Sequence, residues 1–195
     1  MSTPLPPADL HARDPELVVL PADADLHRFY TATYDPIYFD RSQLGRFNAP
    51  DASYGVLYGA QEVAGAFAET FLRTPRNTLI DADFLGRKGY VRLRTTRELR
   101  LVKLTGSGLA RIGATAEVPH RGLPYDTPQA WSKALAAHPI DADGIAYLAR
   151  HDDSQLCFAI FDRAGAALSE VERRIDLDMD WFWEIAMRYR VGLAP

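Results

Sequence analysis

The segment between Gly45 and Arg73 constrains the fold more than any other, because turn, strand and helix signals follow one another there without a break. It opens with GRFN and continues through APDASYG, which is rich in residues that favour turns. The apolar run Val56–Tyr58 then shows the alternation of a short strand. A helix is predicted directly after it, from Gln61 to about Arg73.

The predicted helix has an apolar stripe in which Phe67 and Phe71 lie one turn apart. Glu69 lies outside this stripe, and the residues one turn before it are a small Gly-Ala pair that leaves room for close approach. We therefore predict that Arg46 in the turn, Tyr58 on the strand and Glu69 on the helix are neighbours in space.

Short strands and scattered helices make up the rest of the pattern. The predicted strands are His27–Tyr30, Tyr90–Arg94, Leu99–Leu104, and a hairpin of Ile145–Arg150 and Leu156–Phe161 joined through residues 151–154. The predicted helices are Asp81–Arg87, Gln129–His138 behind a Thr127-Pro128 cap, and Met179–Tyr189. This mixture predicts an α+β fold, a single domain built on a bent mixed or antiparallel sheet.

The two ends of the chain differ in character. Residues 1–25 are rich in proline and are predicted to form an irregular arm, ordered around Leu17–Leu20, so that residues 26–195 form the folded domain. The C-terminal run Met179–Tyr189 carries many large apolar side chains, and we interpret it as a helix that caps the core. A helix that faces another subunit or a partner protein is the alternative, and homo-oligomerisation stays open.

Composition excludes several classes of function. The formal net charge of −4 argues against direct binding of nucleic acid. No apolar run approaches the roughly 20 residues of a membrane span, and the first residues lack the pattern of a secretion signal, so a cytoplasmic location is expected. The histidines are dispersed, and the one cysteine, Cys157, sits in an apolar run. We therefore expect no metal site and a buried structural thiol.

Several stretches together resemble the RES domain family. They are GRFN at 45–48, LY at 57–58, AFAE at 66–69, DGIAYLARHD at 143–152 and LCFAIFD at 156–162. The resemblance spans roughly residues 26–163. It implies an ADP-ribosyltransferase-like fold, a catalytic domain over 26–195, NAD+ as the substrate without a metal, and a toxin neutralised by an Xre-type antitoxin protein.

The resemblance also implies roles for four side chains. Cleavage of the nicotinamide–ribose bond passes through an oxocarbenium-like state that a carboxylate stabilises, and Glu69 is the candidate. A guanidinium suits the pyrophosphate, with Arg46 as the first candidate and Arg28, at the family's first-strand position, as the second. Tyr58 is predicted to pack against the nicotinamide or the ribose. Without the resemblance, a solvated surface role is the better interpretation of each charged residue taken separately.

One position departs from the family. The matching residue for its serine is Ala149, which has no hydroxyl to donate or accept a hydrogen bond. Three functions therefore remain open. The first is a RES-type toxin that degrades NAD+ as a glycohydrolase or phosphorylase. The second is an ADP-ribosyltransferase acting on a protein, and the third is a catalytically weakened module that binds a nucleotide or an antitoxin.

Overall fold

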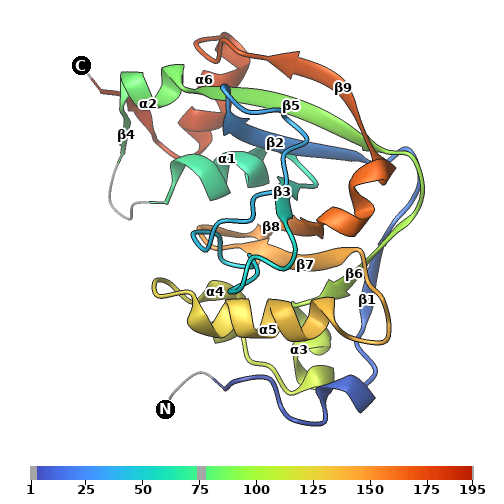
Figure 1. The fold of residues 1–195 in the computed structure, drawn as a ribbon. Helices are drawn as coiled ribbons and strands as arrows, with labels where there is room; N and C mark the ends of the chain where they lie inside the picture. Colours follow the sequence, from blue (N-terminus) through green and yellow to red (C-terminus); the bar gives the residue numbers. More distant parts are fainter. Residues whose placement is uncertain (1–3, 74–77, 195) are drawn as a thin grey trace.

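The computed structural model describes residues 4–73 and 78–194, and in this part of the chain eight strands form one sheet in the order β1-β6-β7-β8-β3-β2-β5-β9 (Figure 1). The strands are β1 Leu17–Leu20, β2 Asp25–Thr31, β3 Val56–Ala60, β5 Lys88–Thr95, β6 Leu99–Lys103, β7 Gly144–Ala149, β8 Asp152–Phe161 and β9 Leu168–Arg174. Neighbouring strands are antiparallel except for the parallel pair β6 and β7. This architecture confirms the predicted α+β class with a mostly antiparallel sheet.

Helices and 3-10 turns form most of the other regular elements of the described residues. They are α1 Val63–Phe71, α2 Ala82–Gly86, α3 Gly106–Ile112, α4 Glu117–His120, α5 Asp126–Ala136 and α6 Asp180–Arg188, with the 3-10 turns η1 Leu10–Ala12 and η2 Asp162–Ala167. A separate parallel pair joins β4 Leu79–Ile80 and β10 Gly192–Leu193. The α5 helix begins before the predicted Thr127-Pro128 cap, because a proline fits within the first turn of a helix.

The predicted arm contains regular structure in its described part. The η1 turn is followed by β1, which pairs antiparallel with β6 at one edge of the sheet. Trp131 on α5 is fully buried, and its Nε1 donates to the Pro4 carbonyl at 2.7 Å. The arm therefore lies against the domain, and a domain boundary at residue 25 stays a prediction.

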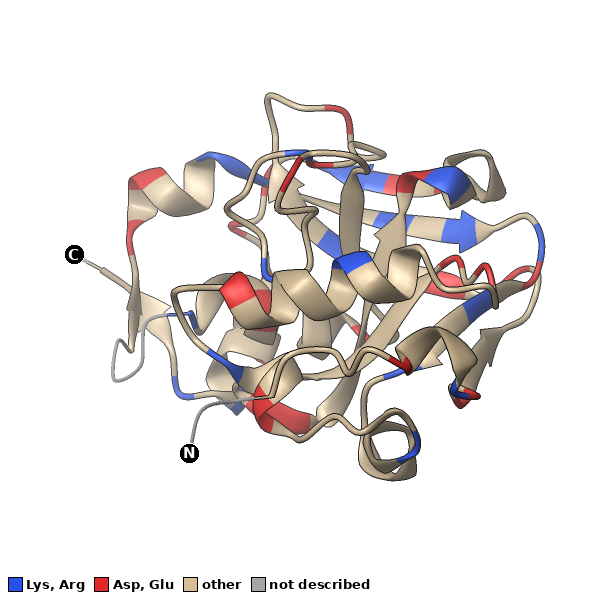
Figure 2. Ribbon diagram, turned by 60° about the horizontal axis from the view of Figure 1, so that its bottom comes forward, with Lys and Arg blue, Asp and Glu red and all other residues tan. Residues whose placement is uncertain are grey.

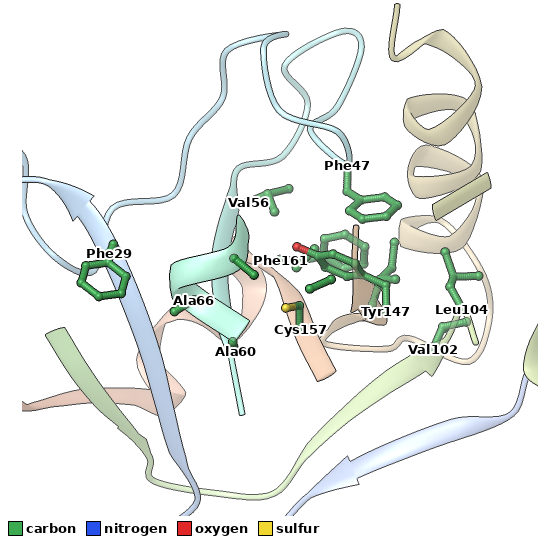
Figure 3. Packing of buried hydrophobic residues seen from close by; sticks show 14 of the residues in the cluster. Phe29, Phe47, Val56, Ala60, Ala66, Val102, Leu104, Tyr147, Cys157 and Phe161 are labelled. Carbon is green, nitrogen blue, oxygen red and sulfur yellow. The ribbon is translucent and has the colours of Figure 1, made fainter. Parts of the chain in front are cut away.

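Buried side chains form two clusters. The larger includes Phe67, Trp131, Tyr147 and Phe182, and the other includes Leu57 and residues of β5, β6 and β8. In Figure 3, Phe29 lies to one side of α1, while Phe47 and Tyr147 lie together on the other side. Helix α1 thus lies between two parts of the larger cluster.

The C-terminal helix α6 closes the larger cluster. Phe182 is fully buried, and its ring centroid lies 5.4 Å from that of Phe67 and 5.1 Å from that of Phe71. Met187, on the same helix, is 66% exposed. The interpretation of this run as a core-capping helix is confirmed, and so is the buried state of Cys157.

The sheet opens between β2 and β3, and this fork positions the site. The register between the two strands consists of the pair His27–Ala60. Beyond it β2 continues beside β5 through Thr31, while β3 continues beside β8 through Val56. Helix α1 packs on β2, β3, β7 and β8. A space is therefore left between the diverging strands and the helix.

Candidate functional site

A cavity of about 640 Å³ lies at the fork between β2 and β3, and its size falls within the range typical of small-molecule sites. Arg28, Arg46, Tyr58 and Glu69 all line this β2–β3 cleft. They come from β2, the loop before β3, β3 and α1, respectively. The structure therefore brings together the four side chains singled out from the sequence, and their chemical roles stay predictions.

Glu69 is held by three groups of the protein. The Arg150 backbone N–H donates to its Oε1 at 2.8 Å, and the Tyr147 hydroxyl donates to its Oε2 at 3.3 Å. The Nη2 of Arg46 forms an ion pair with the same Oε2 at 3.4 Å. The Glu69 side chain is 18% exposed, so a fixed carboxylate with limited access to water faces the cleft.

Arg46 is engaged mainly with the protein. Its Nη1 donates to the Pro119 carbonyl at 3.0 Å, and the guanidinium lies 5.5 Å from the ring centroid of Tyr147. Burial is the largest single influence on the pKa of Arg46 and acts to lower it, but the Glu69 carboxylate and neighbouring tyrosine side chains together raise the pKa above its ordinary value. A permanently charged Arg46 therefore orients Glu69, with little freedom to follow a ligand.

Arg28 bridges the two strands of the fork. Its Nη1 donates to the Tyr58 carbonyl at 2.8 Å, while its buried Nε has no hydrogen-bond partner. Burial lowers the pKa of Arg28 to about 10, opposed in part by Asp40. Arg28 is thus protonated at neutral pH and places a positive charge, incompletely satisfied, at the wall of the cleft.

Tyr58 closes the GRFN turn as well as lining the cleft. Its hydroxyl accepts from the Phe47 backbone N–H at 2.8 Å and donates to Asn48 Oδ1 at 2.9 Å. Asn48 is fully buried, and its Nδ2 donates to Asp40. Because the Tyr58 hydroxyl is already paired, its ring is the part left to contact a ligand.

Close packing within this turn also explains why position 45 is a glycine. A Cβ added to Gly45 would lie 2.2 Å from Asn48 Oδ1 and 2.7 Å from the Tyr58 hydroxyl. We expect Gly45→Ala to displace this pair and to lower the free energy of unfolding by about 1–3 kcal/mol, measured by urea denaturation. Gly86→Ala is the matched control, because a Cβ there meets nothing within 4 Å; equal stability of the two variants would contradict the account.

Sequence reasoning missed the contribution of Tyr147. This residue is almost fully buried on β7, and its hydroxyl reaches Glu69. Burial and the Glu69 carboxylate raise its pKa well above the ordinary value, so it stays a hydrogen-bond donor. Tyr147 is part of the apolar GIAY stretch, and a run of apolar residues does not show which group a tyrosine hydroxyl will contact.

Ala149 is fully buried and packs in the same cluster as Tyr147. Ser154 lies at an exposed position, where its Oγ donates to Asp152 Oδ1 at 2.6 Å. The predicted loop over residues 151–154 is shorter than expected, because β8 already begins at Asp152. Ser154 is therefore occupied in the hairpin and does not line the cleft.

Two negative findings apply to the described residues. In residues 4–73 and 78–194, no group of three or more His, Cys, Asp or Glu side chains is placed to hold a metal ion. The helices in this same part of the chain are all too short or too polar to cross a membrane.

Comparisons with known proteins identify the family and the fold. The profile of the RES domain matches residues 13–181. A chain from the crystal structure of the M. tuberculosis MbcT–MbcA toxin–antitoxin complex has a similar fold, with a TM-score of 0.64 and 15% sequence identity. The similarity covers 87% of this chain and 92% of that chain. No curated protein matches the sequence.

Proposed function

Because the chain belongs to the RES domain family, we propose that it is a toxin that degrades NAD+ by cleaving the nicotinamide–ribose bond in the β2–β3 cleft. The observation that carries this proposal is the meeting of a fixed carboxylate, Glu69, and a buried, incompletely satisfied guanidinium, Arg28, in one cavity of ligand size. The pair matches a substrate with a developing positive charge at the ribose and negative charge on its phosphates.

The chemistry follows from the nature of the leaving group. When the bond from C1′ to the nicotinamide nitrogen breaks, its electron pair stays on that nitrogen, which loses its positive charge. Nicotinamide therefore leaves as a neutral molecule without an acid to protonate it. The positive charge moves to C1′ and the ring oxygen of the ribose, where a nearby carboxylate lowers the energy of the transition state.

Each side chain has a part in this proposal. Glu69 faces C1′ and holds a ribose hydroxyl through a lone pair that Arg150 and Tyr147 leave free. Arg46 and Tyr147 fix the carboxylate, the ring of Tyr58 packs against the nicotinamide or ribose, and Arg28 binds the pyrophosphate. Arg28 thus takes the phosphate role for which the sequence placed Arg46 first, because Arg46 is bound to Glu69 and Pro119.

The acceptor decides which enzyme this is. With water, a new C1′–O bond forms, one proton is released and ADP-ribose results; with inorganic phosphate, the bond forms to a phosphate oxygen and a phosphorylated ADP-ribose results. Phosphorus NMR of the product mixture, with and without added phosphate, distinguishes these outcomes. ADP-ribose found covalently on protein would instead establish a transferase.

An antitoxin partner is part of the same proposal. A fold of this kind occurs in a toxin–antitoxin complex, although at 15% identity that likeness supports the fold and no particular partner. The Xre type of the antitoxin rests on the family resemblance. Co-expression tests the proposal: the chain alone is expected to stop bacterial growth, and an Xre-type protein from a neighbouring reading frame is expected to restore it.

Ala149 favours a second candidate, a module that binds NAD+ with weak or no turnover. A serine at this buried position would add a hydroxyl on the strand that carries Tyr147. We expect Ala149→Ser to strengthen NAD+ binding or raise the cleavage rate about fivefold, since one added hydrogen bond contributes about 1 kcal/mol. Calorimetry and the cleavage rate, compared with Ala146→Ser on the same strand, check this; equal effects of the two variants would remove any role for position 149.

A further inference from the structure

Three basic side chains lie near one another along the wall of the β2–β3 cleft. Arg28, Arg73 and Lys88 all line the cavity, and within the described residues none of them forms an ion pair with a carboxylate. Lys88 Nζ donates to Thr31 Oγ1 at 3.1 Å and lies 5.0 Å from the ring centroid of Phe84. Elsewhere along the ribbon, basic and acidic residues are interspersed (Figure 2).

The grouping is unfavourable in the ligand-free protein. Burial lowers the pKa of Lys88, and the nearby charges of Arg73, Arg28 and Arg87 lower it further. Like charges held together at a partly buried wall repel one another, and an anion bound between them removes that repulsion. Arg94 lies on the same face of β5 but is paired with Asp25 at 2.8 Å. Uncompensated charge is thus specific to the cleft end of this strand.

The spacing along β2 separates two places for negative charge. Arg28 donates to the Tyr58 carbonyl at one level, whereas Lys88 pairs in register with Thr31, three residues further along β2. At about 3.3 Å per residue, these levels are roughly 10 Å apart along the strand. Residues three apart start from opposite faces of a strand, but Arg28 and Lys88 line the same cavity, so both can contact one diphosphate.

Apolar side chains also line the cleft. Phe71, Phe84 and Ile80 lie there, and Phe84 is in contact with the Lys88 ammonium. An aromatic face beside a basic group suits a flat base joined to a phosphate. The cleft therefore combines a carboxylate, a first basic group, a second pair of basic groups and an aromatic side chain beside Lys88.

We propose that Arg73 and Lys88 form an outer anion subsite that holds the phosphate on the adenosine side of the substrate, so that the cleft selects dinucleotides and nucleoside diphosphates over nicotinamide mononucleotide. This rests on the proposed function for the identity of the inner half of the ligand. The subsite itself requires only a nucleoside diphosphate and no bond cleavage.

Calorimetric titration of ADP and, separately, of nicotinamide mononucleotide into the purified full chain tests the subsite. We expect Lys88→Met to weaken ADP binding about tenfold or more, as expected for the loss of one hydrogen bond to a charged group. Nicotinamide mononucleotide binding is expected to change less than about twofold. Arg94→Met is the matched control and is expected to leave both affinities unchanged.

A second variant controls for the possibility that Lys88→Met disturbs folding. Arg73 is exposed, so Arg73→Met is not expected to disturb the core, and it is expected to weaken ADP binding in the same direction. The subsite is overturned if ADP does not bind to the wild type, or if both variants weaken ADP and nicotinamide mononucleotide equally. ADP binding without any release of nicotinamide from NAD+ would contradict the proposed function and leave the subsite standing.

Discussion

Replacing Glu69 by glutamine is expected to lower the rate of nicotinamide release from NAD+ by on the order of 10²–10³-fold, as seen when one electrostatic stabiliser of a transition state is removed. The substitution keeps the shape of the side chain but removes the negative charge opposite the ribose. The amide oxygen of the glutamine can still accept from the Arg150 N–H. Its NH2 group, however, faces the Arg46 guanidinium and carries no negative charge to pair with it. NAD+ affinity is expected to change much less than the rate, because the charge acts mainly on the transition state.

Glu62→Gln is the matched control for this experiment. Glu62 stands at the N-terminal end of the same helix, is exposed and does not line the β2–β3 cleft. It is expected to cleave NAD+ at the wild-type rate. Full activity in Glu69→Gln, with a circular dichroism spectrum and melting temperature like those of the wild type, would remove Glu69 from the reaction.

The second large effect concerns stability. Phe67 is fully buried at the centre of α1. Its ring centroid lies 6.4 Å from that of Phe29 on β2 and 5.4 Å from that of Phe182 on α6. Phe67→Ala leaves a cavity where the helix joins the two sides of the fork. We expect the free energy of unfolding to fall by about 3–5 kcal/mol, measured by urea denaturation.

An exposed apolar residue provides the comparison. Met187 on α6 is 66% exposed, and Met187→Ala is expected to change the free energy of unfolding by less than about 0.5 kcal/mol. A loss below about 1 kcal/mol for Phe67→Ala would mean that the surrounding rings collapse into the space, contrary to the close packing described here.

The parts of the fold that sequence predicted are those with a strong local pattern. The stripe through Phe67 and Phe71 identified α1, and the apolar runs identified β7 and β8. The β9 strand, Leu168–Arg174, escaped notice because it lies at the edge of the sheet and carries charged residues along most of its length. Edge strands of this kind lack the apolar alternation that sequence analysis detects.

Four side chains that line the cleft could be named from the sequence, but their geometry could not. Arg46 and Glu69 do meet, as their placement on a turn and a helix suggested. The fork between β2 and β3 depends on where pairing stops, at His27–Ala60, and no local pattern encodes that end point. The backbone N–H of Arg150 is equally invisible in sequence, because every residue other than proline offers one.

The most direct test of the central claim follows NAD+ and free nicotinamide by proton NMR in the presence of the purified wild-type chain and phosphate. We predict that NAD+ disappears and that nicotinamide appears in equal amount. An unchanged NAD+ signal, from protein shown to be folded and free of antitoxin, would contradict the assignment of the β2–β3 cleft as an NAD+-cleaving site.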